Sequence, residues 1–437
     1  MKIEKTIALS KNVARLSHLD IPGGGQVMVQ GNYAYIGHLR PPEGTTIVDV
    51  SDPRKPRIVC QLKIDDPYMH SHKARIVGDI MITNVERYNY LFVRKAERMP
   101  SAKSQLRERL GRHARPAELA AELLVEESDL PKLEEIIARG FEGGGFKVWD
   151  VSDRSKPRLL SYVKTHGLGV HRFDMDARYA YISTEMEGFH GNILVIYDIG
   201  DPTKPFEVSR WWMPGQHVAA GEKPTWRGFD NRLHHTMRHG DYLYAGCWHA
   251  GMRVIDVTDI TQPKTVGEYN YHPPFPEPTH TFLRVPFQVD GRDVAVVVDE
   301  EHQHVDTKDG ERHSGLPHAS LWVFDVADFG NMHPLSCFQL GELDSPWSRT
   351  PGGRFGAHQF QEHMDDTLVY CTWFTGGVRI VDIANPLRPN EVGYFIPEPV
   401  MGQACPMSND VDTDGRGLIY LLDRFAGFDI LEFDRRS

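Results

Sequence analysis

A short apolar strand that ends in an acidic residue and runs into a turn recurs seven times along this 437-residue chain. The copies read TTIVDVSDPRKPR, FKVWDVSDRSKPR, LVIYDIGDPTKPF, MRVIDVTDITQPK, LWVFDVADFGNMH, VRIVDIANPLRPN and FDILEFDRR, and a second strand precedes each. β-Branched and aromatic residues favour strands, whereas aspartate and proline favour turns. Such repeats bury their faces only by packing on one another. We therefore predict an all-β fold, a single seven-bladed β-propeller over residues 1–437.

The turns VDVSDP and IVDI resemble those of the LVIVD-repeat family of β-propellers. The resemblance covers nearly the whole chain and implies the propeller fold. It implies no particular activity, because such a repeat describes a scaffold that can host many functions.

One segment departs from the strand pattern. Between Val93 and Gly143, leucines and isoleucines recur at helical spacing among many charges. Pro100, Pro116 and Pro131 are expected to separate two or three helices. We predict a helical insertion in blade two, at residues 93–143. It would serve as a surface decoration, as the contact of a homodimer, or as a lid.

Histidine is the unusual residue type, with 22 copies in the chain. The first strand of each blade lines the central channel of a propeller, so equivalent positions on these strands face one axis. Five histidines fall near the start of predicted first strands: His72, His171, His235, His280 and His358. Asn409 takes this place in blade seven, and Gly25 or its neighbour takes it in blade one. Neutral imidazole is a common transition-metal ligand, so we predict one divalent ion on the axis. Fe(II) is favoured, with Zn, Mn, Cu and Ni as alternatives.

A second layer of residues is predicted around these histidines. Glu86, Glu185 and Glu300 end the second strands of blades two, three and five, where each should lie close to the histidine of its own blade. A carboxylate that accepts the distal imidazole N–H fixes the tautomer and raises ligand basicity. Trp248 and Trp373 take this place in blades four and six, and they are expected to wall the site.

The arrangement resembles, in the logic of its site rather than in extended sequence, the carotenoid cleavage oxygenases. Those are seven-bladed propellers with Fe(II) held on the axis by four histidines and supported by glutamates. It is also similar to the selenium-binding protein family, whose propellers serve as thiol oxidases with histidine-bound copper. The five histidines and three glutamates named above carry the resemblance. Five histidines exceed a four-histidine site by one, so one of them would contact substrate or act as a base.

The substrate side is expected at the long loops before His235 and His358, which contain Trp226, Arg227 and Arg349. Aromatic walls with a few arginines would suit a small organic substrate, aromatic and anionic. Trp248, Trp373 and Asn409 complete the candidate catalytic and substrate-binding residues. A further cluster, His302, His304, His313 and His318, is either a polar loop or a second metal site.

Composition excludes several classes of function. The formal net charge of −11 without a basic stripe argues against a nucleic-acid partner. No apolar run is long enough for a membrane span, and the N-terminus lacks the features of a signal peptide, so a cytoplasmic protein is expected. The five scattered cysteines suggest neither disulfides nor a thiolate zinc site.

We therefore expect a mononuclear metal-dependent enzyme, with a non-haem Fe(II) oxidoreductase or oxygenase favoured. A redox-neutral metal-dependent hydrolase or lyase is the first alternative. The second alternative is a non-catalytic interaction propeller with a structural metal.

Overall fold

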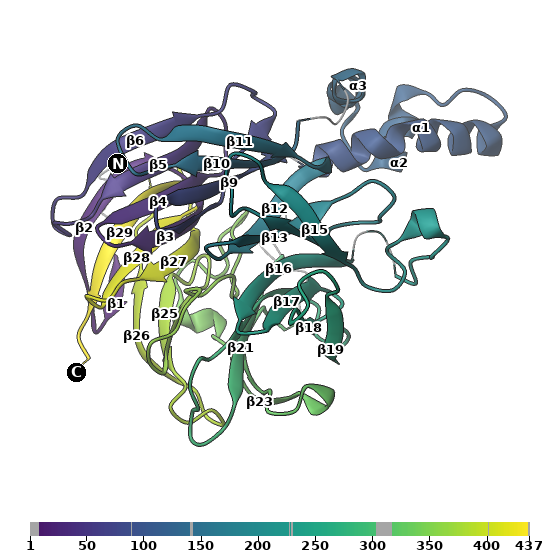
Figure 1. Cartoon of the computed structure of the whole chain (residues 1–437). Coiled ribbons are helices and arrows are strands. Elements are labelled where there is room, and N and C mark those ends of the chain that lie inside the picture. The colour runs from purple at the N-terminus through teal and green to yellow at the C-terminus, as the bar shows by residue number, and fades with distance from the viewer. Residues whose placement is uncertain are drawn as a thin grey trace.

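The computed structural model describes residues 8–88, 90–139, 143–226, 228, 230–302, 317–400 and 402–435. Over these residues antiparallel strands dominate, which confirms the prediction of an all-β fold. Figure 1 shows the sheets following one another around a common centre.

The strands follow the chain in consecutive antiparallel groups. Single residue pairs, Gly169 with Glu86 and Trp248 with Thr279, join the second group to the third and the fourth to the fifth as larger sheets. The first group is β3 (Gly24–Gln30), β4 (Tyr33–His38), β5 (Glu43–Asp49) and β6 (Arg57–Lys63). The second is β7 (Met69–His70), β8 (Ala74–Val77), β9 (Ile80–Arg87), β10 (Gly145–Asp150) and β11 (Arg158–Lys164). The third is β12 (His166–Met175), β13 (Tyr179–Glu185), β14 (Ile193–Asp198) and β15 (Phe206–Trp211). The fourth group is β16 (Asn231–His239), β17 (Tyr242–Trp248), β18 (Met252–Asp256) and β19 (Lys264–Tyr269). The fifth is β20 (Thr279–Arg284), β21 (Val294–Asp299), β22 (Leu321–Asp325) and β23 (His333–Phe338).

The N-terminal strands complete the last two groups and so close the ring. β1 (Leu9–Lys11) pairs with β26 (Asn390–Ile396), beyond β25 (Val378–Asp382) and β24 (Leu368–Thr372). β2 (Val13–Pro22) pairs with β29 (Ala426–Phe433), beyond β28 (Leu418–Asp423) and β27 (Ser408–Thr413). The purple and yellow strands therefore lie side by side in Figure 1. A closed ring of sheets with few free edges is a β-propeller.

The hydrophobic core lies between neighbouring groups of strands. One cluster joins Val296 and Val298 of β21 to Val381 of β25, and another joins Ile36 of β4 to Tyr420 of β28. Further clusters join the other consecutive groups in the same way. Each group therefore buries both faces only because it has a neighbour on either side.

The recurring aspartate of the repeat has a structural role at the end of the third strand in six of the groups; the last copy, FDILEFDRR, carries Glu432 in its place. Asp49 accepts a hydrogen bond from the backbone N–H of Ser51 at 3.0 Å, and Asp256 accepts one from Thr258 at 2.8 Å. The same contact recurs two residues beyond Asp150, Asp198, Asp325 and Asp382. An aspartate side chain that binds the backbone two residues on stabilises a turn, which explains the recurrence.

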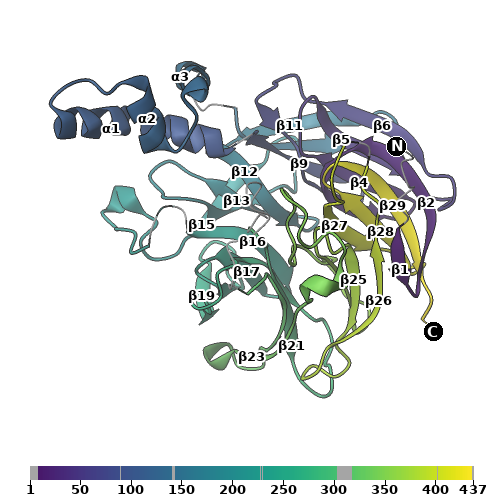
Figure 2. The same ribbon diagram turned by 180° about the vertical axis from the view of Figure 1, so that it is seen from behind.

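Between β9 and β10 the described residues form three α-helices: α1 (Tyr90–Leu110), α2 (Pro116–Leu123) and α3 (Leu130–Arg139). Short 3₁₀ turns are η1 (Glu127–Asp129), η2 (Val218–Ala220), η3 (Phe329–Asn331) and η4 (Glu342–Asp344). The helices share a core with one another and with Leu168 of β12, and they project beyond the sheets in Figure 2. Within the described part of the chain, no helix is both long and apolar enough to cross a bilayer.

Pro100 does not separate two helices, contrary to the sequence-based prediction, because it lies inside α1. A proline removes one helical hydrogen bond. The buried side chains of Met99 and Ala102 pack against the other helices and hold α1 together on both sides of that position. Residues 140–142, at the end of the predicted 93–143 segment, lie outside the described residues.

Candidate metal centre

A local break in strand register recurs at one place in successive groups. The ladder between the first and second strands shifts around Gly25, His171, His234, His280 and Asn409. Such a bulge leaves one residue unpaired in the ladder and re-aims its side chain. His72 and His358 occupy the same place, since the residues after them, Lys73 and Gln359, pair with Asn84 and Thr372.

Gly25 supplies no side chain because there is no room for one. A Cβ at this position would lie 2.5 Å from the backbone oxygen of His72 and 2.8 Å from its Cβ. The histidines of the other groups therefore form an arc rather than a complete ring, with Asn409 at one end.

The imidazole rings of this arc contact one another in sequence. The ring centroids are 5.5 Å apart for His72 and His171, 4.8 Å for His171 and His234, 4.2 Å for His234 and His280, and 4.6 Å for His280 and His358. We call His171, His234, His280 and His358 the histidine cluster. An additional residue, His70 of β7, stacks on His72 at 4.2 Å.

Hydrogen bonds fix the tautomers of His171 and His234. The Nδ1 atom of His171 lies 2.9 Å from the Glu86 carboxylate, and that of His234 lies 2.9 Å from the carbonyl oxygen of His280. Both partners only accept, so each Nδ1 carries the proton and each Nε2 a lone pair. The two Nε2 atoms lie 3.0 Å apart. Two neutral imidazoles cannot hydrogen-bond in this way, whereas a cation between them would satisfy both.

The same logic applies to His280 and His358. The Nδ1 of His280 lies 2.9 Å from Thr281 Oγ1, whose own proton goes to Gln359 Oε1 at 2.7 Å. The Nδ1 of His358 donates to the backbone oxygen of Asn409. Their Nε2 lone pairs are both 3.8 Å from the Glu300 carboxylate. The histidine cluster thus presents four Nε2 lone pairs, each fixed by an acceptor behind its ring.

His72 differs from the cluster in its hydrogen bonding. The side-chain amide of Asn84 donates to His72 Nδ1 at 3.0 Å, and its orientation is fixed because its oxygen accepts from the Lys73 N–H. Neutral His72 therefore carries its proton on Nε2, the opposite of the other four rings.

Two of the three predicted glutamates contact these histidines. Glu86 lies 2.9 Å from His171 and 3.0 Å from His70, so it bridges two strand groups. Glu300 lies among His280, His302 and His358, and Arg354 approaches it at 3.3 Å. Glu185 is turned away from His171, because it accepts from the Leu168 N–H at 2.9 Å and pairs with Arg94 of α1.

Burial sets the charge state of the site. It lowers the pKa of His234, His280 and His358 well below the ordinary value, so these imidazoles are neutral at pH 7. Burial alone would raise the pKa of Glu86, but the neighbouring His171 and His70 outweigh it and hold the pKa below its ordinary value. The pKa of Glu300 is lowered against burial in the same way, by His302, His358 and His280. Neutral imidazoles beside ionised carboxylates are the charge state that binds a cation.

His235 is placed differently from the sequence-based expectation. Its Nδ1 lies 3.7 Å from Glu362, deeper in the channel, and His234 takes the place in the cluster. Neighbouring residues of a strand point in opposite directions, and the bulge decides which of the two faces the axis end.

The same one-residue difference separates Trp373 from Phe374. Trp373 is fully buried in the core against Phe338. The ring of Phe374 lies against that of His358, with the centroids 4.7 Å apart and an interplanar angle of 31°. Trp248 is the matching residue on the other side of the cluster. Its ring centroid lies 5.0 Å from that of His234, with an interplanar angle of 31°. Both Phe374 and Trp248 have positive φ, 41° and 57°, at the end of the second strand.

The other predicted substrate residues do not lie together in the structure. Arg349 is exposed and pairs with Glu342, and Trp226 packs against His190 and Gly215. Asn409 lies at the site, where its amide contacts Gly25 and Arg424. Arg227, His304 and His313 lie outside the described residues.

Two of the three arginines that border the cluster, Arg232 and Arg354, lie in the long loops before His235 and His358 where the sequence predicted the substrate side, whereas Arg424 was not predicted. Arg354 and Arg424 lie 5.6 and 5.0 Å from the centroid of Phe374, and Arg232 lies 4.0 Å from that of Trp248. Arg424 could have been found, since it ends its second strand as Glu86 and Glu300 do.

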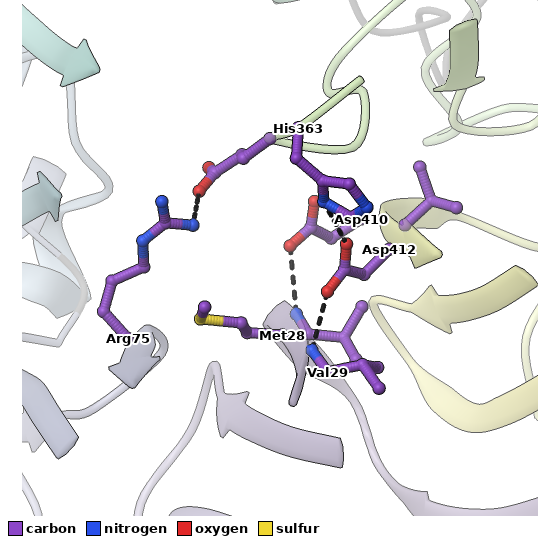
Figure 3. A pocket seen from close by; sticks show the side chains of 9 residues that line it. Met28, Val29, Arg75, His363, Asp410 and Asp412 are labelled. Atoms are coloured by element: carbon purple, nitrogen blue, oxygen red, sulfur yellow. Dashed lines mark hydrogen bonds and ion pairs between the residues drawn. The ribbon is translucent and has the colours of Figure 1, made fainter. Parts of the chain in front are cut away.

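Beyond the cluster, the channel is filled by a polar network around Glu362. This carboxylate accepts from Gln26 and Gln359 at 3.1 Å and from Arg172 at 3.2 Å, and it pairs with Arg75. Figure 3 shows the small cavity that lies on this network, with a volume of about 100 Å³. Its lining residues are Val27, Met28, Val29, Arg75, Glu362, His363, Asp410, Val411 and Asp412.

Comparison with known proteins supports the fold. A chain of the mitotic checkpoint complex gives a TM-score of 0.53 at 8% identity and covers 98% of both chains. A protein from Lactobacillus plantarum gives 0.51 at 11% identity, covering 93% of this chain and 89% of that one. At these identities the likeness concerns the fold alone. A search of curated proteins gave no match. The model of the LVIVD repeat matches residues 24–62, 178–211, 239–271 and 369–396. The chain therefore carries LVIVD repeats in a β-propeller fold.

Proposed function

We propose that this protein is a metal-dependent enzyme whose ion is held by the histidine cluster on the axis of a seven-bladed propeller. The strand groups support seven blades, since five follow in sequence from β3 to β23 and two more are completed by β1 and β2. The helices between the paired strands β9 and β10 then form an insertion in blade two, within one domain.

The observation that carries the proposal is the 3.0 Å contact between the Nε2 lone pairs of His171 and His234. At metal–nitrogen bond lengths of about 2.1 Å, two ligands at a right angle lie about 3.0 Å apart. His280 and His358 offer further Nε2 lone pairs beside them. No arrangement of protons on neutral rings satisfies this contact together with the Nδ1 contacts of His171 to Glu86 and of His234 to the carbonyl oxygen of His280.

The donor set favours redox chemistry. His234, His280 and Glu300 place their ligand atoms within 4.8 Å of one another. Two histidines and a carboxylate are the ligand type of non-haem Fe(II) oxygenases, and imidazole also suits Zn, Cu and Ni. We therefore favour an Fe(II) oxidoreductase that uses dioxygen, ahead of a hydrolase or lyase. When bound, such an ion would supply the site for dioxygen activation, while the chain's residues hold and orient the substrate.

The surroundings of the cluster favour an anionic substrate with a flat, conjugated part. Arg232, Arg354 and Arg424 border the site, and guanidinium groups suit carboxylate or phenolate recognition. Trp248 and Phe374 offer aromatic faces on either side of the cluster. The helical insertion follows directly after β9, which carries Glu86, and it is fixed to β13 by the pair of Arg94 and Glu185. This position supports a role as a cover for the same end of the channel.

Elemental analysis of the full-length protein from its own host, combined with oxygen-uptake measurements, tests the proposal. We expect bound iron and oxygen consumption with small aromatic acids. Turnover of such a substrate under strict anoxia would favour the hydrolase or lyase. Protein that contains no transition metal after purification and takes up none would refute the metal centre.

A further inference from the structure

We infer that a second divalent transition-metal ion binds beside the first, held by His70, His72 and Glu86. This deepens the proposed function and rests on it for His171 as a ligand of the first ion. The three residues are 7%, 4% and 4% exposed, and each offers a ligand atom within 4.8 Å of the other two.

The hydrogen bonds of His70 point to a cation. Its Nδ1 lies 3.1 Å from the carbonyl oxygen of Leu39, which takes the Nδ1 proton. Its Nε2 then carries a lone pair, yet it faces Glu86 Oε2 at 3.0 Å, and an ionised carboxylate only accepts. Two acceptors at this distance need a positive centre between them. Their separation is that of two adjacent ligands on one ion.

His72 supplies the third ligand. Its ring stacks on that of His70 at 4.2 Å, and its Nδ1 lies 3.7 Å from Glu86 Oε2. Asn84 donates to this Nδ1 and also to the carbonyl of Val170. The amide of Asn84 therefore keeps one of its two bonds when the Nδ1 of His72 turns to an ion. Two imidazoles and a carboxylate are again the ligand type that suits iron, zinc and similar divalent ions.

Glu86 connects the two sites. Its Oε1 accepts the Nδ1 proton of His171, whose Nε2 faces His234. Its Oε2 is the atom directed at His70. An ion on Oε2 draws electron density from the carboxylate and makes it a weaker acceptor for His171. Occupation of the second site therefore lowers the affinity of the first.

Cobalt titration of the chelator-treated, full-length protein tests the inference, with bound cobalt counted by elemental analysis. We expect about two ions per chain in the wild type, about one in His70→Gln or in His234→Gln, and none in the double variant. His72→Asn provides a second probe of the new site. The exposed His333→Gln serves as the matched control and keeps two ions. Circular dichroism melting establishes that each variant folds.

The outcomes separate the two proposals. One ion in both wild type and His70→Gln, lost in His234→Gln, would overturn the second site and leave the proposed function standing; the contact of His70 with Glu86 would then be an ion pair of imidazolium and carboxylate. Two ions in a folded His70→Gln variant would also overturn the second site. No bound cobalt in the wild type would overturn both.

Discussion

The Nε2 atoms of His171 and His234 face each other at 3.0 Å although both rings carry their proton on Nδ1. The two residues come from β12 and β16, whose blades are neighbours in the ring. The contact depends on the register of the strands, because the bulge in each ladder turns the imidazole toward the axis.

Substitution of adjacent histidines provides a direct test of the register. His234→Gln should lower the metal content by about one ion per chain, because it removes one of two converging lone pairs. His235→Gln should leave the metal content unchanged, since His235 faces Glu362 deeper in the channel. Elemental analysis of the two folded variants gives the answer. The reverse pattern would contradict the assignment of His234.

Glu86→Gln should weaken metal binding at the histidine cluster by about 10- to 100-fold, in the range of outer-shell substitutions. The carboxylate accepts the Nδ1 proton of His171 and so raises the basicity of its Nε2, which a neutral amide does less well. Competition with a chelator of known affinity measures the effect. Glu185→Gln is the matched control, since Glu185 pairs with Arg94 instead. Equal losses in both variants would argue against a specific role of Glu86.

Thr281 should act as a positioning residue for His280. Its hydroxyl accepts the Nδ1 proton of His280 and donates to Gln359, which in turn donates to Glu362. Thr281→Val removes the acceptor without changing the shape of the side chain. We expect about tenfold weaker cobalt binding and an altered visible spectrum of the bound ion. Thr281→Ser should restore both, and a serine variant as impaired as the valine variant would contradict this role.

The metal-free protein should lose stability as the pH falls. Buried His72, His234, His280 and His358 have pKa values well below the ordinary value in the folded chain. Below about pH 6.5 the unfolded chain takes up protons that the folded chain does not, so the free energy of unfolding falls. Each such histidine contributes up to about 1.4 kcal/mol per pH unit.

Urea denaturation between about pH 7.5 and pH 5 measures this slope. A His280→Gln, His358→Gln variant has two fewer such groups, so its stability should depend less steeply on pH. Parallel curves for the variant and the wild type would show that these residues are not buried as neutral imidazoles.

The sequence by itself determined the all-β propeller, because apolar strands with an aspartate turn leave few other ways to bury their faces. It also indicated which part of each repeat lines the channel. In this way it identified the candidate residues His72, His171, His280, His358, Glu86 and Glu300. These positions follow from alignment of the repeats, which needs no knowledge of contacts between blades.

Only the tertiary structure decided between residues one position apart. His234 instead of His235, and Phe374 instead of Trp373, depend on bulges and on residues with positive φ, which shift a side chain to the other face without changing the strand pattern. The sequence could not predict the contacts between blades either. Glu86 reaches His171 of the next group, Glu185 turns to α1, and His70 joins from β7. Such contacts depend on how neighbouring sheets pack, and a repeat describes only one sheet at a time.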